Sequence, residues 1–173
     1  SMFYIFLGLP IARLADRGSR KWVVTAGVFF WSLMTCLCGV TRSFSTLFLA
    51  RVGVGVGEAA LSPPAYSLLS DYFSEDSLPR AMAVYTLGIT VGGGLAYIIG
   101  GGVYEYFTEH GALSLPVLGD LRPWQTTFVI VGLPGFFLVL MLSLMSEPPR
   151  RGAPATDYSL AEVKTHLCLH WQA

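Results

Sequence analysis

Four long apolar stretches constrain the fold of this 173-residue chain more than any other feature. They run over residues 22–40, 45–69, 80–104 and 124–145. Each is long enough to cross a bilayer, which takes ~20 mostly apolar residues. Residues 3–14 have the composition of the tail of a further span. Because lipid cannot satisfy backbone polar groups, these stretches are predicted to be helices, and residues 1–147 a partial all-α integral membrane bundle.

Charged residues are scarce, which excludes two broad classes of protein. They make up 13% of the chain, against ~25% in soluble domains, so they could not cover the surface of a soluble protein of this length. The net charge is zero, so nothing indicates a nucleic-acid partner, and membrane lipid is the expected surroundings.

The basic residues are distributed unevenly between the linkers. Seven lie in linkers that fall on one side of the membrane, namely Arg13, Arg17, Arg20, Lys21, Arg80, Arg150 and Arg151. The linkers on the other side hold only Arg42 and Arg122. Cytoplasmic loops carry the excess of Lys and Arg, so we expect the Arg13–Lys21 loop and the C-terminal tail to be cytoplasmic, in a plasma or bacterial inner membrane.

The tail over residues 148–173 is more polar than the rest of the chain. It is expected to be a cytoplasmic linker with a short amphipathic helix, for which Asp157 is a candidate cap. His166 and His170 lie four residues apart there, but two histidines without a third ligand do not make a metal site. No metal or other cofactor is expected.

Arg51 and Glu58 are ionisable residues within the second apolar stretch. A charge in the middle of a bilayer costs at least ~2.5–3.5 kcal/mol, so such residues usually serve a function. They are seven residues apart, which places them on one face of a helix, ~10.5 Å apart along its axis. We expect this face to meet a cavity, with Glu58 as a candidate proton carrier and Arg51 as an anion anchor or counter-charge. A structural ion pair with another helix is the alternative.

Small residues recur at helical spacing in the second and third stretches. They include Gly53 and Gly57, and then Gly88, Gly92, Ala96 and Gly100. Such stripes let helix backbones approach closely, so packing is expected, and a helix that slides or bends there is the alternative. Pro63 and Pro64 remove backbone donors and predict a kink in the second stretch.

The linker over residues 12–21 resembles a signature loop of the major facilitator superfamily, which joins its second and third helices. The matching residues are Leu14, Ala15, Asp16, Arg17, Arg20 and Lys21, whereas Ala12 and Ser19 replace two glycines. Residues 124–128 and 147–150 resemble the entry and exit of helix six, with Gln125 in place of an arginine. The resemblance implies that the complete spans are helices three to six, and that helix one and a C-terminal half complete the transporter.

Residues 51–59 resemble helix four of the Spinster-like branch, and Asp71, Arg80 and residues 92–98 continue the similarity. This resemblance implies transport of lysolipids or sphingoid lipids, as in some members of the branch. We expect a secondary transporter that works by alternating access, coupled to protons through Glu58, for lysolipids or other amphipathic organic anions. By position, Asp16, Arg17, Arg20, Asp71 and Arg80 would form a cytoplasmic gating network between the two halves. Arg51 and Glu58 would lie on the pathway of substrate and proton. Gly93 stands where antiporters have a proline, which leaves symport or antiport open.

Other functions remain as alternatives at this point. A drug exporter and a sugar-acid or organic-anion symporter of the same superfamily would share these features. A non-transporting membrane scaffold or receptor would also keep the bundle, and in it Arg51 and Glu58 would affect only stability. An enzyme is not expected, because the apolar stretches contain no nucleophile–base pair and no metal cluster.

Overall fold

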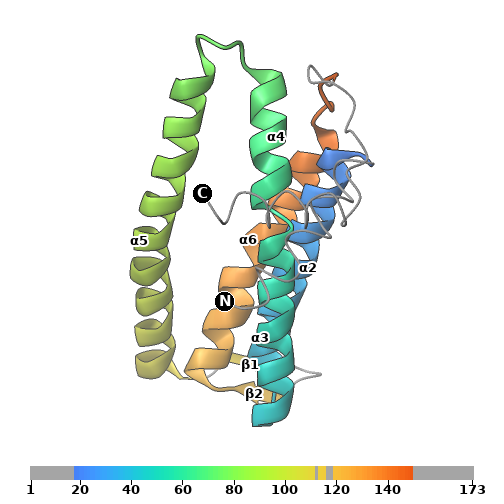
Figure 1. Ribbon diagram of the computed structural model, residues 1–173. Coiled ribbons are helices and arrows are strands. Elements are labelled where there is room, and N and C mark those ends of the chain that lie inside the picture. Colours follow the sequence, from blue (N-terminus) through green and yellow to red (C-terminus); the bar gives the residue numbers. More distant parts are fainter. Residues whose placement is uncertain (1–17, 112, 116–118, 150–173) are drawn as a thin grey trace, which may run out of the picture.

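The computed structural model describes residues 18–111, 113–115 and 119–149, which form a bundle of long helices with one short hairpin (Figure 1). The elements in chain order are α2 (Arg20–Val40), α3 (Phe44–Ala59), α4 (Ser62–Tyr72), α5 (Leu78–His110), β1 (Leu113–Leu115), β2 (Gly119–Leu121) and α6 (Pro123–Leu144). Four helical segments in this part of the chain are long and apolar enough to span a membrane, with α3 and α4 counted as one, which confirms the predicted fold class. The expected helices at residues 3–14 and after residue 149 lie outside the described residues.

The starts of the helices follow ordinary capping chemistry. The Ser19 side chain accepts a hydrogen bond from the Trp22 backbone N–H and caps α2. Ser43 and Thr46 form a reciprocal capping box at the start of α3, with both backbone-to-hydroxyl distances 3.3 Å. Proline occupies the first turn of α4, α5 and α6, where its missing N–H costs nothing.

The second apolar stretch is not one kinked helix over residues 45–69, as the sequence predicted, but two helices. α3 ends at Ala59, and α4 begins at Ser62. Pro63 and Pro64 occupy the first turn of α4, where a missing N–H costs nothing, and they remove the backbone donors that the carbonyls of Ala59 and Ala60 would need to continue α3. The break therefore precedes the prolines instead of falling on them.

α5 is longer than the expected span over residues 80–104. It runs to His110 and ends at Gly111, whose φ of 95° is a left-handed conformation that favours glycine. The last turns contain Glu105 and Glu109, which are good helix formers although they are too polar for the bilayer core. β1 and β2 then pair antiparallel, with Leu113 opposite Leu121, and lead into α6. The sequence pattern does not predict this hairpin.

Glycines bring α2 close to both α3 and α6. A Cβ added at Gly57 of α3 would lie 2.8 Å from the Trp31 backbone nitrogen, and one added at Gly27 of α2 would lie 3.2 Å from the Gly57 carbonyl oxygen. On α6, a Cβ at Gly132 would lie 2.6 Å from the Cys36 sulfur. Helix backbones can come this near only where there is no side chain. α2 is therefore the helix that joins α3 to α6.

α5 stands to one side of the other helices in Figure 1, and none of its residues is buried. A Cβ added at Gly88, Gly92 or Gly100 would meet no atom of the described residues within 4 Å. Gly53, by contrast, is buried and faces the Met34 side chain, 2.6 Å from an added Cβ. The role of the α5 glycines in packing or bending stays a prediction.

The α2–α3 contact predicts opposite effects at two neighbouring glycines. Gly57→Ala forces Cβ onto the Trp31 backbone, which cannot move like a flexible side chain, so we expect a loss of about 1–3 kcal/mol of stability. Gly55→Ala is the control, because a Cβ there meets nothing within 4 Å and alanine stabilises a helix by up to ~1 kcal/mol. Thermal unfolding of the purified protein in detergent measures both. Equal melting temperatures for the two variants would contradict this contact.

Candidate functional site

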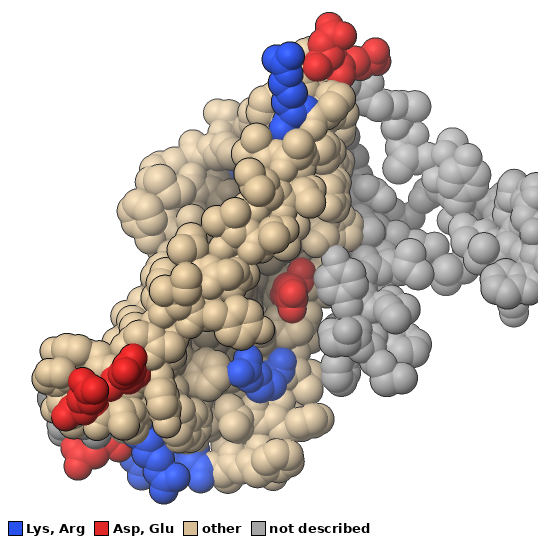
Figure 2. Space-filling model, turned by 90° about the vertical axis from the view of Figure 1, so that its left-hand side faces the viewer, with Lys and Arg blue, Asp and Glu red and all other residues tan. Residues whose placement is uncertain are grey.

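Arg51 and Glu58 lie on α3, and both side chains are exposed in the described part of the chain. Neither forms an ion pair with the other or with any other residue that the structure describes. In Figure 2 most charged side chains gather at the two ends of the molecule, while acidic and basic ones also lie midway along a face that is otherwise tan. The structural ion pair that the sequence left open is thus not made within the described ranges.

One aromatic residue of α6 contacts Arg51 and a second one supports it, and sequence reasoning did not single them out for this role. The Arg51 Cζ lies 4.5 Å from the centroid of the Phe128 ring, which is a cation–π contact. The Trp124 ring lies one turn before Phe128 and meets it edge-on, with centroids 6.2 Å apart and planes at 83°. The guanidinium therefore rests on an aromatic surface and not on a carboxylate.

The end of α3 lies directly after Glu58. The Leu61 backbone N–H donates to the Glu58 carbonyl at 3.1 Å, and the Ala60 N–H donates to the Gly57 carbonyl at 3.2 Å, which tightens the last turn. Since Pro63 and Pro64 have no N–H, the carbonyls four residues earlier, those of Ala59 and Ala60, lose their helical donors. Interrupted helices at membrane depth are tolerated where they are covered by protein or line a cavity, as in transporter sites.

A second group of polar residues lies at the end of the bundle where α2 begins and α4 and α6 end. Arg20 is 3% exposed and pairs with Asp71 of α4, which is 8% exposed. The same guanidinium donates to the Ser67 hydroxyl at 2.8 Å. Its Nε lies 3.7 Å from a carboxylate oxygen of Glu147, which follows α6. Arg20 thus joins three helix ends, because a buried cation requires partners.

Glu147 is the member of this group that sequence reasoning did not assign. It accepts a hydrogen bond from the Arg20 backbone N–H at 2.8 Å and another from the Ser19 hydroxyl, so it completes the cap of α2. Partial burial opposes its ionisation, but these hydrogen bonds and the Arg20 charge outweigh burial and hold the pKa of Glu147 below its ordinary value. The signal was in the sequence, since a lone carboxylate directly follows an apolar span.

The other predicted members of the gating network are placed differently. Asp16 and Arg17 lie outside the described residues. Arg80, on α5, is exposed and makes no ion pair with a described residue, so the structure brings together only Arg20 and Asp71 of the five. The role of the network in gating stays a prediction.

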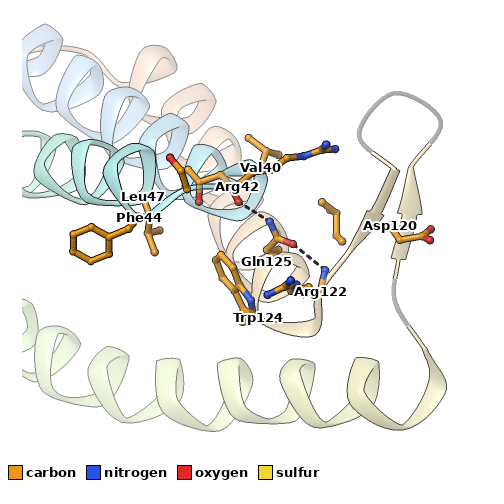
Figure 3. Close-up of a pocket in the computed structure, with 11 residues that line it drawn as sticks. Val40, Arg42, Phe44, Leu47, Asp120, Arg122, Trp124 and Gln125 are labelled. Carbon is orange, nitrogen blue, oxygen red and sulfur yellow. Dashed lines mark hydrogen bonds between the residues drawn. The ribbon is translucent and has the colours of Figure 1, made fainter.

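The opposite end of the bundle contains a cavity of about 420 Å³ between the α2–α3 loop and the start of α6. Gln125 donates to the Thr41 carbonyl at 2.8 Å and accepts from the Arg122 backbone N–H at 3.0 Å, as the dashed lines in Figure 3 show. The carboxylate of Asp120 points away from Gln125 and Trp124. Gln125 therefore ties the loop to α6, and the polar groups here do not converge on one point as in a binding site.

The long apolar helices define a polytopic helical membrane protein, with two ionisable residues inside one of its spans. Residues 1–170 match the family model described as Major Facilitator Superfamily. The chain belongs to this family, which confirms the resemblance seen in the sequence. It also confirms that the chain is part of a family of transporters and not of enzymes.

Several curated relatives carry the name Spinster. Protein spinster homolog 1 of Xenopus laevis is 34% identical over 87% of this chain, and the human protein has the same identity and coverage. The probable L-galactonate transporter of Escherichia coli is 27% identical over 81% of the chain. The chain spans 26% of the length of the spinster homologs and 28% of the L-galactonate transporter.

Two solved structures share the fold. They are crystal structures of a bacterial homolog to the human lysosomal transporter Spinster, in inward-facing unoccupied and occupied conformations. The unoccupied structure is 36% identical with a TM-score of 0.69, and covers 93% of this chain and 36% of its own. The occupied structure is 39% identical with the same TM-score, and covers 86% of this chain and 35% of its own. The Spinster-like assignment is thus confirmed.

The geometry of Glu147 predicts that the start of α2 depends on a charged carboxylate. Glu147→Gln should speed hydrogen exchange at the Arg20 amide by roughly 5- to 30-fold, since a charge-assisted hydrogen bond contributes ~1–2 kcal/mol. Folding lowers the pKa of Glu147. The contribution of this carboxylate to the stability of the folded state is therefore fully present above about pH 4.5, and it is lost as the pH falls through the lower folded pKa. Glu75→Gln, in the exposed α4–α5 loop, is the control. Unchanged exchange in Glu147→Gln would contradict the cap.

Proposed function

We propose that this chain is part of a secondary active transporter that works by alternating access and couples transport to protons. The observation that carries the proposal is the pair formed by Arg51 and Glu58 on one exposed face of α3, without an ion pair in the described ranges. A charge inside a membrane span is retained at a cost of a few kcal/mol, and function is the usual reason. Glu58 would take up and release the proton, and Arg51 would bind an anionic group of the substrate.

The substrate class follows from two features of the surroundings. An arginine that contacts Phe128, with Trp124 packed against that ring, offers a cation beside an apolar surface, which suits an amphipathic anion. The relatives named Spinster favour the same class, because the Spinster-like branch includes transporters of lysolipids. We propose lysolipids or other amphipathic organic anions as substrates, carried across a plasma or bacterial inner membrane.

A sugar-acid or organic-anion symporter is the second candidate. It is favoured by the similarity to the probable L-galactonate transporter and by the same arginine, since a carboxylate is an equally good partner for a guanidinium. The two candidates differ in the rest of the substrate, which is an acyl chain in one and a set of hydroxyls in the other.

The cytoplasmic end would act as a latch. Arg20 and Asp71, joined by Glu147, connect α2, α4 and the exit of α6. In this proposal Asp16, Arg17 and Arg80 extend the network toward the C-terminal half of the transporter, and the latch opens when the two halves rock. The Arg13–Lys21 loop and the tail would lie in the cytoplasm, since α2 and α5 begin at this end of the bundle (Figure 1) and their first turns contain Arg20, Lys21 and Arg80.

The role of Glu58 is tested by flux in the full-length protein that contains this chain, reconstituted in liposomes. Glu58→Gln should reduce proton-gradient-driven uptake of a labelled lysolipid by at least ~100-fold and leave folding intact, because an amide cannot carry the proton. L-galactonate serves as the second substrate in the same assay.

Glu75→Gln is the matched control, since it removes a carboxylate from an exposed loop. Wild-type flux in Glu58→Gln at every pH would contradict the proton role. No flux of either substrate by intact wild-type protein would contradict both candidate functions and favour a scaffold or receptor.

A further inference from the structure

We propose that Phe128 is a positioning residue that holds Arg51 for an oxyanion, with Trp124 holding Phe128 in turn. This inference rests on the proposed function, because it assigns the way in which Arg51 recognises the anionic group of the substrate. The three residues come from two helices, with Arg51 on α3 and the two aromatic residues on α6.

The contact leaves the hydrogen-bonding groups of Arg51 available. A guanidinium held over a ring face uses none of its five N–H donors in a conventional hydrogen bond to that ring. Arg51 makes no side-chain hydrogen bond or ion pair with a described residue, so the ring at 4.5 Å is the contact that holds the cation. An anion that binds at the edge of the guanidinium does not have to displace the ring.

The edge of the guanidinium selects the chemistry of the ligand. Two parallel N–H donors match two oxygens of a carboxylate or of a phosphate, and such bidentate pairs are stronger than single hydrogen bonds. The expected ligand is therefore a carboxylate or a phosphate with apolar atoms beside it, where it can contact the aromatic residues. A free arginine side chain has ~2 kcal/mol of rotamer entropy to lose, and the contact with Phe128 removes part of that cost before the anion arrives.

The position of Phe128 is itself fixed by its neighbours. Trp124 packs edge-on against it, with centroids 6.2 Å apart. Between them, Gln125 is 7% exposed and bonds to the Thr41 carbonyl, which holds the first turns of α6 against the end of α2. Close packing of Gly132 on Cys36 fixes the next turns. The ring is thus held by a rigid helix pair, as a positioning group must be.

Fluorination of the ring tests the inference without changing the size of the side chain much. Mono-, di- and trifluorophenylalanine at position 128 of the full-length protein progressively weaken the negative electrostatic potential on the face of the ring. Binding of lysophosphatidylglycerol and of L-galactonate in detergent should weaken stepwise, by about 2- to 30-fold at the end of the series. The two probes separate a phosphate from a carboxylate, and uncharged monoacylglycerol should show no such series.

The matched control is the same series at Phe136, on the same helix. Its ring meets Phe29 edge-on at 5.7 Å, and no cation–π contact with a described residue involves it. Stepwise weakening at position 128 and not at position 136 supports the inference. The inference is overturned if fluorination at position 128 leaves binding unchanged, if it has equal effects at both positions, or if the wild-type protein binds neither anion. Proton-driven flux, together with unchanged binding across the fluorination series at position 128, would contradict this inference alone. Binding that weakens along the series, without any flux, would contradict the proposed transport.

Discussion

The cost of holding ionisable side chains inside a bilayer is the constraint on which this structure depends. Apolar side chains on α5 and α6 can face lipid without penalty, and many of them are exposed. Arg51 and Glu58 cannot, since each would cost at least ~2.5 kcal/mol in hydrocarbon. Their face of α3 must therefore meet water, a partner helix or a ligand, and for this reason we propose α3 as the functional helix of the segment. The break after Ala59 lies directly beside it.

The remaining helices make this face rigid. α2 contacts α3 through Gly27 and Gly57 and contacts α6 through Gly132, so the side chains of α6 are fixed relative to those of α3. Arg20 fastens one end of this assembly through Asp71 and Glu147, and Gln125 fastens the other end through Thr41. α5 has no buried residue in the described ranges and shares few of these contacts, so the rigid unit consists of α2, α3 and α6.

Much of this could be predicted from the sequence, because hydropathy and charge act over short distances along the chain. The apolar stretches and the shared face of Arg51 and Glu58 follow from length and helical period alone. The capping of α2 by Glu147 and the contact of Arg51 with Phe128 could not be predicted, because they join residues 127 and 77 positions apart. The sequence predicted a kink at Pro63 and Pro64, whereas the break lies before them, because each proline removes the donor to the carbonyl four residues earlier.

The central claim, that the Glu58 face of α3 meets water within the membrane, is tested most directly by cysteine accessibility. Cys36, Cys38 and Cys168 are first replaced by serine in the full-length protein, and Glu58→Cys and Ala59→Cys are compared. Ala59 is 0% exposed and lies between helices, so it is the matched negative control, and Ser77→Cys in the loop before α5 is the positive one. We expect a membrane-impermeant maleimide to label positions 58 and 77 but not 59. Labelling of position 77 alone would place Glu58 away from water and contradict the account.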